Sequence, residues 1–172
     1  MPHPPIQIVN DSDQPIGEAS IDETYDKGLL HRVVYIILED PSGRLLLQKR
    51  SPQVVNYPNR WDISSAGHVD AGESYEEAAS RELLEEAGLE SDGLDIKEID
   101  YFRSDEKHAG GILKHRFNKI YKAVIPADTS FKPQPEEVTG FKWFDIKAAK
   151  KLIAESPDDV ATGLVLCVDR YY

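Results

Sequence analysis

Cysteine is almost absent from this sequence, with Cys167 the one thiol among 172 residues. A single thiol excludes an internal disulfide and a cysteine-rich zinc site, so a reducing, cytoplasmic compartment is the simplest expectation. Long apolar runs are also missing, because the longest extends only from Val33 to Leu38, whereas a membrane-spanning helix needs about 20 residues. The opening residues 1–5 lack the cationic and apolar regions of a signal peptide, and no membrane association is expected.

Positive charge is scarce as well. The chain has 20 Lys and Arg against 31 Asp and Glu, a formal net charge of −11. Nucleic acids and anionic membranes are bound by clustered Lys and Arg, so neither is expected as a partner. An anionic ligand would therefore need positive charge from another source.

The length and the 40% apolar content predict one domain over residues 1–172. Pro15-Ile16-Gly17 indicates a turn in an N-terminal arm of edge strands, residues 1–27. A turn at 40–43 predicts a hairpin, and a polar loop holds Ala109-Gly110-Gly111. The mixed order of elements predicts an α/β sandwich with a mixed sheet, an α+β arrangement being the alternative. Strands are expected at 6–9, 31–38, 44–50, 61–66, 94–103, 112–125 and 140–144, and helices at 74–88 and, within 145–172, after Asp145 and after Ser156-Pro157.

The clearest helix begins at Ser74, which forms a capping box with Glu77, and ends at Gly88. At 100° per residue, Glu82, Glu85 and Glu86 share one arc of this helix. Like charges so spaced destabilise a helix by a few tenths of a kcal/mol, which a bound cation would reverse. Three carboxylates are hard oxygen ligands suited to Mg²⁺ or Mn²⁺, although a cluster of acids alone is more often a solvated face.

The wider spacing favours the metal site over the solvated face. It follows the pattern that defines the Nudix box over residues 67–89, and the sequence therefore resembles the Nudix superfamily. The matching positions are Gly67, Glu73, Arg81-Glu82-Leu83, Glu85-Glu86 and Gly88-Leu89. This resemblance implies an α/β/α sandwich and a hydrolase that cleaves a diphosphate linkage of a nucleoside compound when water attacks phosphorus.

The resemblance also implies roles for individual residues. The metal ligands would be Glu82, Glu85 and Glu86, joined by the carbonyl of Gly67, while Glu73 and Arg81 would form a structural ion pair. For the general base, the candidates are the box glutamates (Glu82 and Glu85), then Glu136 and Glu137 in the proline-rich loop 126–139, then Asp105 and Glu106. Substrate phosphate could be held by Lys49, Arg50 and Arg60, and a base could stack on Tyr57 or Trp61, which are equally compatible with core positions.

Further segments, at residues 28–32, 47–50 and 57–61 outside the box and at 66–69 where it begins, are similar to the isopentenyl-diphosphate isomerase branch. The isomerases have a cysteine where this chain has Ala66 and a Glu-x-Glu pair where it has Lys114-His115-Arg116. Their box is degraded and this one is intact, so we predict a hydrolase on an isomerase-like scaffold. His31 and His68 resemble isomerase metal ligands, but neutral packed histidines are the preferred interpretation.

Several alternatives stay open at this point. They are the isomerase itself, a Nudix domain that only senses a ligand, and a hydrolase of RNA ends, which the scarcity of basic residues disfavours. The expected substrate is a small nucleoside di- or triphosphate or a related small diphosphate, and the resemblance is compatible with a homodimer. Cys167 is expected to be a small buried residue of the last helix.

Overall fold

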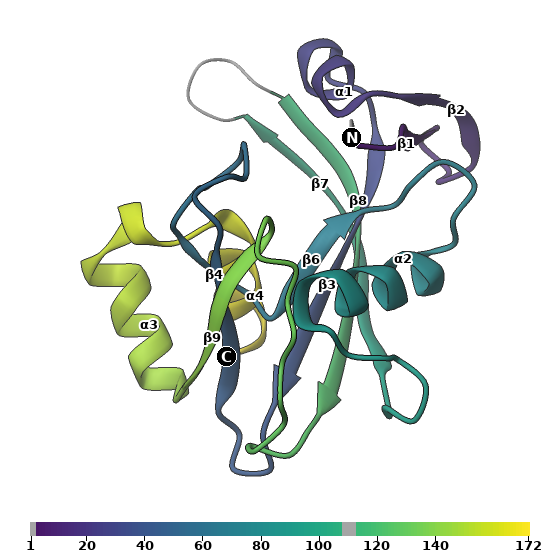
Figure 1. The fold of residues 1–172 in the computed structure, drawn as a ribbon. Coiled ribbons are helices and arrows are strands. Elements are labelled where there is room, and N and C mark those ends of the chain that lie inside the picture. Colours follow the sequence, from purple (N-terminus) through teal and green to yellow (C-terminus); the bar gives the residue numbers. More distant parts are fainter. Residues whose placement is uncertain (1–2, 108–112) are drawn as a thin grey trace.

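A computed structural model describes residues 3–107 and 113–172 of the chain (Figure 1). Within these residues, nine strands form one mixed sheet. The strands are β1 Ile6–Val9, β2 Pro15–Ala19, β3 His31–Glu39, β4 Leu45–Arg50, β5 Trp61–Asp62, β6 Ser65–His68, β7 Lys97–Lys107, β8 Leu113–Val124 and β9 Val138–Phe144. The helical elements are α1 Ile21–Lys27, α2 Tyr75–Glu82, the π-helical η1 Leu83–Ala87, α3 Ile146–Glu155, the 3₁₀ turn η2 Pro157–Asp159 and α4 Thr162–Tyr171.

The sheet is organised around β3. This strand pairs in parallel with β8 over its whole length, from His31 opposite Arg116 to Glu39 opposite Val124. The pairings of β3 with β1, β4 and β6 are antiparallel, and so is the pairing of β8 with β7. The expected mixed sheet of an α/β protein is therefore confirmed.

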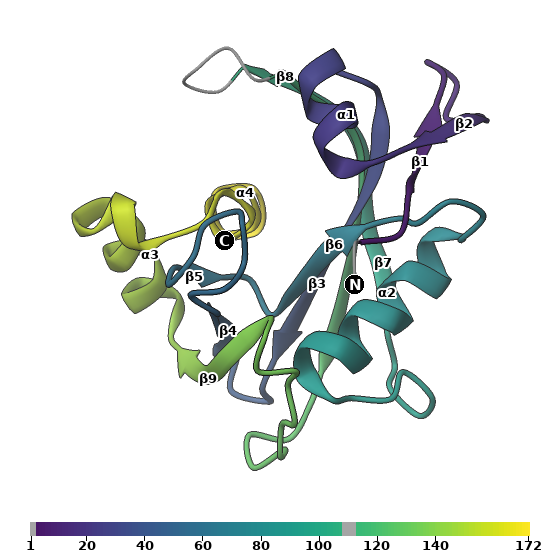
Figure 2. The ribbon, with the colours of Figure 1, turned by 45° about the horizontal axis from the view of Figure 1, so that its top comes forward.

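Helices cover both faces of this sheet. Alternate residues of β3 point to opposite faces, and each set belongs to a different apolar cluster. One cluster joins Val34, Ile36 and Leu38 to Ala78, Ala79 and Leu83 of α2 and η1. The other joins Val33, Tyr35 and Ile37 to Leu164, Cys167 and Val168 of α4. Figure 2 shows α2 on one side of the sheet and α3 with α4 on the other, so the α/β/α sandwich is confirmed, as is the burial of Cys167. No helix of the described residues is long and apolar enough to cross a membrane.

The N-terminal arm differs from its prediction in two ways. Pro15-Ile16-Gly17 is part of β2 and not a turn, because the chain reverses earlier, where the side chain of Asn10 accepts bonds from the backbone N–H of Ser12 and Gln14. Helix α1 was not expected. Only its two ends have sequence signals: Ser20 caps the first turn, and Gly28 ends the helix with a left-handed φ of 60°.

Two further expectations needed correction. The strand expected at 61–66 is two strands, since β5 pairs with β4 and β6 pairs with β3. The last helix begins at Thr162, because Ser156-Pro157 starts only the 3₁₀ turn η2. The hairpin predicted at the turn 40–43 is confirmed, because β3 and β4 pair antiparallel at Glu39 and Leu45, after which β4 follows β9. The loop predicted around Ala109-Gly110-Gly111 lies outside the described residues.

Asp13 ties the N-terminal arm to the rest of the molecule. Its carboxylate accepts bonds from Arg32 Nε at 2.7 Å, from the Tyr75 hydroxyl at 2.9 Å and from the Tyr101 hydroxyl at 2.7 Å. These partners belong to β3, α2 and β7. Asp13 itself has a left-handed φ of 57°, which Asp and Asn tolerate better than other side chains. One residue therefore connects three elements to the turn before β2.

Removing this carboxylate should destabilise the fold. In the Asp13→Ala variant, Arg32 Nε, the hydroxyl of the buried Tyr75 and the hydroxyl of the exposed Tyr101 lose their acceptor, and we expect a loss of about 2–4 kcal/mol in the free energy of unfolding. Denaturant unfolding would measure it. The control is Asp11→Ala, whose ion pair with Arg103 is exposed and should contribute less than about 1 kcal/mol. Equal losses in the two variants would contradict the role given to Asp13.

Candidate active site

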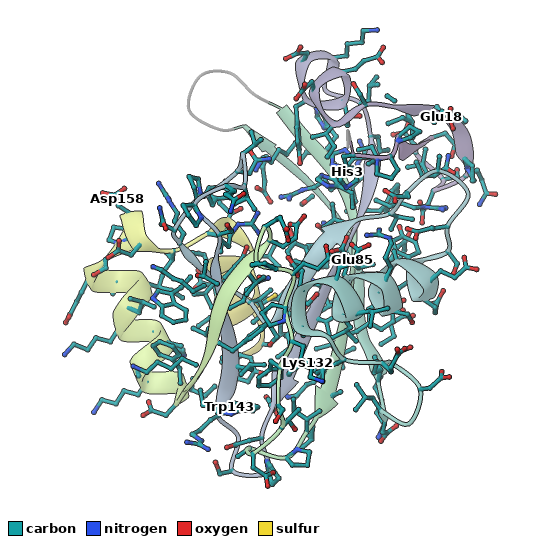
Figure 3. All side chains as sticks on the ribbon, in the orientation of Figure 1. His3, Glu18, Glu85, Lys132, Trp143 and Asp158 are labelled. Atoms are coloured by element: carbon teal, nitrogen blue, oxygen red, sulfur yellow. The ribbon has the colours of Figure 1, made fainter. Side chains whose placement is uncertain are left out.

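A cavity of about 550 Å³ opens beside the end of α2. Its walls come from β6, α2 and η1, the loop 51–60, the loop before β9, strand β8 and the start of α4. Figure 3 labels two of the residues that line it, His3 and Glu85. Segments from most of the chain therefore contribute to one site.

The three box carboxylates differ in exposure. Glu82 and Glu86 are 7% and 4% exposed, whereas the Glu85 side chain is 38% exposed. Oε2 of Glu86 accepts a bond from the backbone N–H of Ala66 at 2.9 Å and one from Gln48 Nε2 at 3.1 Å. The site therefore places two acidic side chains near one another in the interior.

Burial changes the protonation of these two residues. Desolvation, followed by the proximity of Glu86, raises the pKa of Glu82 well above its ordinary value. Desolvation also raises the pKa of Glu86 to about 7, although the N–H of Ala66 and the charge of Arg50 act against it. A divalent cation between such groups would favour their ionised forms.

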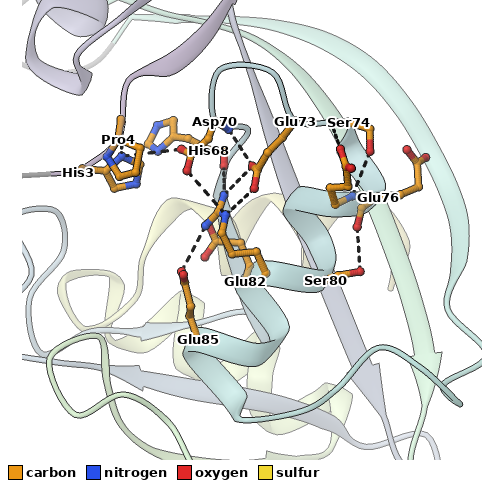
Figure 4. Close-up of polar contacts among 12 residues, drawn as sticks. His3, Pro4, His68, Asp70, Glu73, Ser74, Glu76, Ser80, Glu82 and Glu85 are labelled. Atoms are coloured by element: carbon orange, nitrogen blue, oxygen red, sulfur yellow. Dashed lines mark hydrogen bonds and ion pairs between the residues drawn. The ribbon is translucent and has the colours of Figure 1, made fainter.

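Arg81 organises the box, and Figure 4 labels its carboxylate partners Glu73, Glu82 and Glu85. Its Nε and Nη2 donate to the two oxygens of Glu73 at 2.8 and 3.0 Å, which is a bidentate ion pair. Nη2 also donates to the carbonyl of His68 at 2.9 Å, and Nη1 donates to Glu82 at 2.8 Å and Glu85 at 3.2 Å. Burial by itself would lower the pKa of Arg81, but the contacts with Glu73, Glu82 and Asp70 together raise it above its ordinary value. The ion pair of Glu73 and Arg81 thus fixes the loop after β6 to the helix.

The helix itself changes geometry within the box. The capping box of Ser74 and Glu77 is present, as predicted, but residues Leu83–Ala87 form a π-helical turn that ends at Gly88, with φ 66°. Such turns are rare and often lie at functional sites. The even 100° spacing assumed for Glu82, Glu85 and Glu86 therefore does not hold between the first of them and the other two.

Gly67 lies directly against the Glu82 carboxylate. A Cβ on residue 67 would stand 1.9 Å from Oε1 of Glu82, so only glycine leaves room for that carboxylate beside the backbone of β6. A buried carboxylate, a second buried carboxylate and a backbone carbonyl suit a hard divalent cation. This donor set therefore fits Mg²⁺. Nevertheless, in the described parts of the chain no three acidic, histidine or cysteine side chains already converge as a metal site, and Arg81, Gln48 and Ala66 hold the carboxylates instead.

The structure separates the three predicted phosphate-binding cations. Arg50 lines the cavity, 3.5 Å from the buried Asp62 carboxylate. Lys49 lies over the ring of Trp61 and Arg60 donates to the carbonyl of Val160 at 3.2 Å. Within the described residues, neither of these two lines the cavity.

The other candidate bases are also separated. Glu136 and Glu137 are exposed and line the cavity, and the N–H of Ser51 donates to the carbonyl of Glu137 at 2.8 Å. In contrast, Asp105 bonds the His115 ring at 2.6 Å, and Glu106 accepts from Arg116 at 2.9 Å. The loop before β9 therefore brings its two glutamates to the same cavity as the box.

Two histidines, His31 of β3 and His68 of β6, lie side by side, and His68 lines the cavity. Desolvation lowers the pKa of His31 to about 4 and that of His68 well below its ordinary value, so both are neutral, as predicted. Nε2 of His68 is 2.7 Å from the Tyr25 hydroxyl. Tyr57 lines the cavity, whereas Trp61 packs edge-on against Phe144 at 5.3 Å.

Residues that the sequence did not assign to the site complete its walls. Lys114 and Arg116 line the cavity, and alternation along the predicted strand 112–125 would have placed them on one face. Gln48 contacts Glu86, and a polar residue after three leucines was its signal. Tyr25 lies on the helix that was not predicted, so no pattern pointed to it.

Comparisons with known proteins agree with this geometry. The sequence profile of the NUDIX domain matches residues 29–162, and the chain belongs to the Nudix family. Within that family it is a pyrophosphohydrolase, a hydrolase of phosphoric anhydride bonds.

Individual relatives show which branch is similar. An isopentenyl-diphosphate Delta-isomerase of Nocardia farcinica is 29% identical, with 89% of this chain and 86% of the relative covered. A prenyl-diphosphate phosphatase of Methanosarcina mazei is 31% identical, with coverage of 92% and 89%. Among solved structures, the Deinococcus radiodurans protein DR0079 superposes with a TM-score of 0.80 at 26% identity, covering 98% of this chain and 99% of that one. The resemblance to the isomerase-like branch is therefore confirmed.

Proposed function

We propose that this protein is a magnesium-dependent Nudix hydrolase that cleaves the diphosphate linkage of a small nucleoside di- or triphosphate or a related small diphosphate. The observation that carries the proposal is the pair of buried carboxylates, Glu82 and Glu86, beside Glu85 and the bare backbone of Gly67. The same cavity is lined by cations, among them Arg50. The cavity therefore has carboxylates that could bind a metal ion and, close to them, a cationic side chain that could bind a phosphate.

The chain's own residues define how the reaction would proceed. Glu82, Glu85, Glu86 and the Gly67 carbonyl would hold Mg²⁺. The ion, when bound, supplies charge neutralisation of the diphosphate and a water of lowered pKa. Arg50 would orient the phosphate, and Arg81 keeps the box carboxylates in place. Glu137 or Glu136, at the cavity wall, would accept the proton of the attacking water if no box glutamate does so.

Alkene isomerisation is the weaker candidate. Ala66 lies at the position of the cysteine that isomerases use, and Lys114 and Arg116 face the cavity where those enzymes carry a carboxylate pair. Two cations cannot bind a metal ion or protonate an alkene in that place. The sensing role is also disfavoured because every box carboxylate is retained.

A substrate panel tests the proposed function. The purified chain would be incubated with Mg²⁺ and nucleoside di- and triphosphates, nucleotide sugars, dinucleotide polyphosphates, coenzyme A and prenyl diphosphates. We expect hydrolysis of at least one compound, and oxygen-18 from labelled water should appear in a phosphate product because water attacks phosphorus. Glu85→Gln should lower turnover by about 10²-fold or more, since it removes an anionic ligand of the proposed Mg²⁺ ion, which would neutralise the diphosphate and lower the pKa of the attacking water.

Two outcomes would count against the proposal. Conversion of isopentenyl diphosphate to its allylic isomer would reveal an isomerase instead. Tight binding of one compound without turnover of any would reveal a sensor. The exposed Glu90, just beyond the box, offers a matched control: Glu90→Gln should hydrolyse the substrate at the wild-type rate. We also propose that residues 1–172 act as one domain, and homodimer formation stays a prediction.

A further inference from the structure

Strand β8 brings two positive charges into the cavity. Lys114 and Arg116 are two positions apart, so they project from the same face of the strand, and both line the cavity with the box glutamates. Neither is needed to hold the carboxylates, because Arg81 already bonds Glu82 and Glu85. The wall formed by these two cations therefore lacks a role in the site described so far.

The ammonium group of Lys114 is surrounded by aromatic side chains. Its Nζ lies 5.2 Å from the ring of Tyr57 and 5.8 Å from the ring of Tyr25, and 3.3 Å from the Tyr57 hydroxyl. Within the described residues, these rings and this hydroxyl are the polar and cation–π contacts of Nζ, and no carboxylate lies at ion-pair distance. Its charge thus stays available to an anion in the cavity.

Arg116 is held more rigidly. Its side chain is 5% exposed; Nη1 donates to the Tyr35 hydroxyl at 3.1 Å and Nη2 to Glu106 at 2.9 Å. Nε is buried and has no hydrogen-bond partner among the described residues, which is costly for a charged donor. Glu106 offsets one of the two positive charges, so Lys114 and Arg116 together leave this wall cationic.

The surroundings give this charge more weight. The chain as a whole has a formal net charge of −11, and another wall of the same cavity holds the box carboxylates. Lys114 and Arg116 therefore give an anion positive charge that most of the protein surface does not offer. Two cations with a hydroxyl match the several oxygen atoms of a phosphate better than the two of a carboxylate.

We propose that Lys114 and Arg116, with the hydroxyl of Tyr57, form an anion subsite that holds a phosphate group of the substrate. This rests on the proposed function, since it assigns a second phosphate contact to the same cavity. Lys114 would bind as a mobile point charge, and Arg116 would act from a fixed position. The subsite makes affinity for the phosphate depend on β8 and not only on the metal ligands.

Binding of inorganic pyrophosphate in the presence of EDTA tests the subsite without metal or turnover. We expect calorimetry to show Lys114→Gln and Arg116→Lys binding at least about tenfold more weakly than wild type, since each loses a charge-assisted contact or its geometry. Lys147→Gln on the exposed side of α3 is the matched control and should bind like wild type. Glu85→Gln should bind no more weakly, because it removes negative charge. Wild-type affinity in Lys114→Gln and in the double variant Lys114→Gln/Arg116→Lys would overturn the proposal.

A kinetic measurement separates substrate binding from a purely structural role. With any hydrolysed substrate, Lys114→Gln should raise KM by about tenfold and change kcat by less than about threefold, whereas a loss of folded protein would lower kcat alone. Circular dichroism checks folding, and if Arg116 variants do not fold, Lys114→Gln decides. Pyrophosphate binding that depends on Lys114, with no compound hydrolysed, would support the subsite and overturn the proposed function. Hydrolysis by Lys114→Gln with the KM of the wild type would support the proposed function and overturn the subsite.

Discussion

The Glu86→Gln variant is expected to lose hydrolysis by about 10²- to 10³-fold while folding at least as stably as the wild type at pH 8. The loss follows from removing a charged oxygen ligand at the place where negative charge develops. The retained stability follows from burial, because Glu86 is 4% exposed and its pKa is raised to about 7 by desolvation. Glutamine keeps the shape and can still accept from the N–H of Ala66.

The pH dependence of this effect has a definite sign. Below the unfolded-state pKa of about 4.5, Glu86 is protonated in both states. Between that value and about 7, the unfolded chain ionises first, so the metal-free wild type loses stability as the pH rises. The Glu86→Gln variant lacks this term, and its stability should fall less between pH 5 and pH 8. Thermal unfolding in EDTA at several pH values measures both curves.

Magnesium should distinguish the two proteins further. A ligand that binds only the folded state raises its stability, so Mg²⁺ is expected to raise the unfolding temperature of the wild type and to raise that of Glu86→Gln less. Glu90→Gln again serves as the control, since its side chain is exposed beyond the box. Hydrolysis by Glu86→Gln at a rate within a fewfold of the wild type would show that Glu86 is not needed as a metal ligand.

The Gly67→Ala variant is expected to lose activity by about 10²-fold and to lose about 1–3 kcal/mol of stability. The new methyl group would stand 1.9 Å from Oε1 of Glu82 and 2.2 Å from its carboxyl carbon. Either Glu82 must leave its position or β6 must move, and both displace a proposed metal ligand. Gly140→Ala in β9 is the control, because a Cβ there meets no atom within 4 Å.

A double-mutant cycle tests the cause of that loss. If the methyl group acts through Glu82, then Gly67→Ala should cost much less stability in a Glu82→Ala background than in the wild type. Activity should stay low in the double variant, since the carboxylate is gone. An equal stability cost in both backgrounds would show that the glycine is needed for the backbone of β6 and not for its neighbour.

The sequence predicted the parts of the site that depend on local pattern. The spacing of the box from Gly67 to Leu89 identified the family, and the capping box of Ser74 gave the start of the helix correctly. The apolar run of β3 correctly predicted a strand buried on both faces. These features succeed because each is decided by residues close together in the chain.

Features that depend on tertiary contacts were not predictable in this way. The π-helical turn at Leu83–Ala87 has no marker in composition. Which of Lys49, Arg50 and Arg60 reaches the cavity depends on how the loop 51–60 folds, with left-handed φ values at Tyr57 and Asn59. The position of Lys114 beside the box requires the pairing of β8 with β3, which joins segments far apart in sequence.

That parallel pairing has a consequence for the order in which the chain folds. His31 pairs with Arg116, so the whole box lies inside the long loop that this pairing closes. Closing long loops is slow, and proteins rich in such contacts fold slowly. On the ribosome, the acidic helix would be synthesised before the strand that gives its sheet a neighbour and its cavity a cationic wall. The active site should therefore be completed late in folding, after most of the chain has been made.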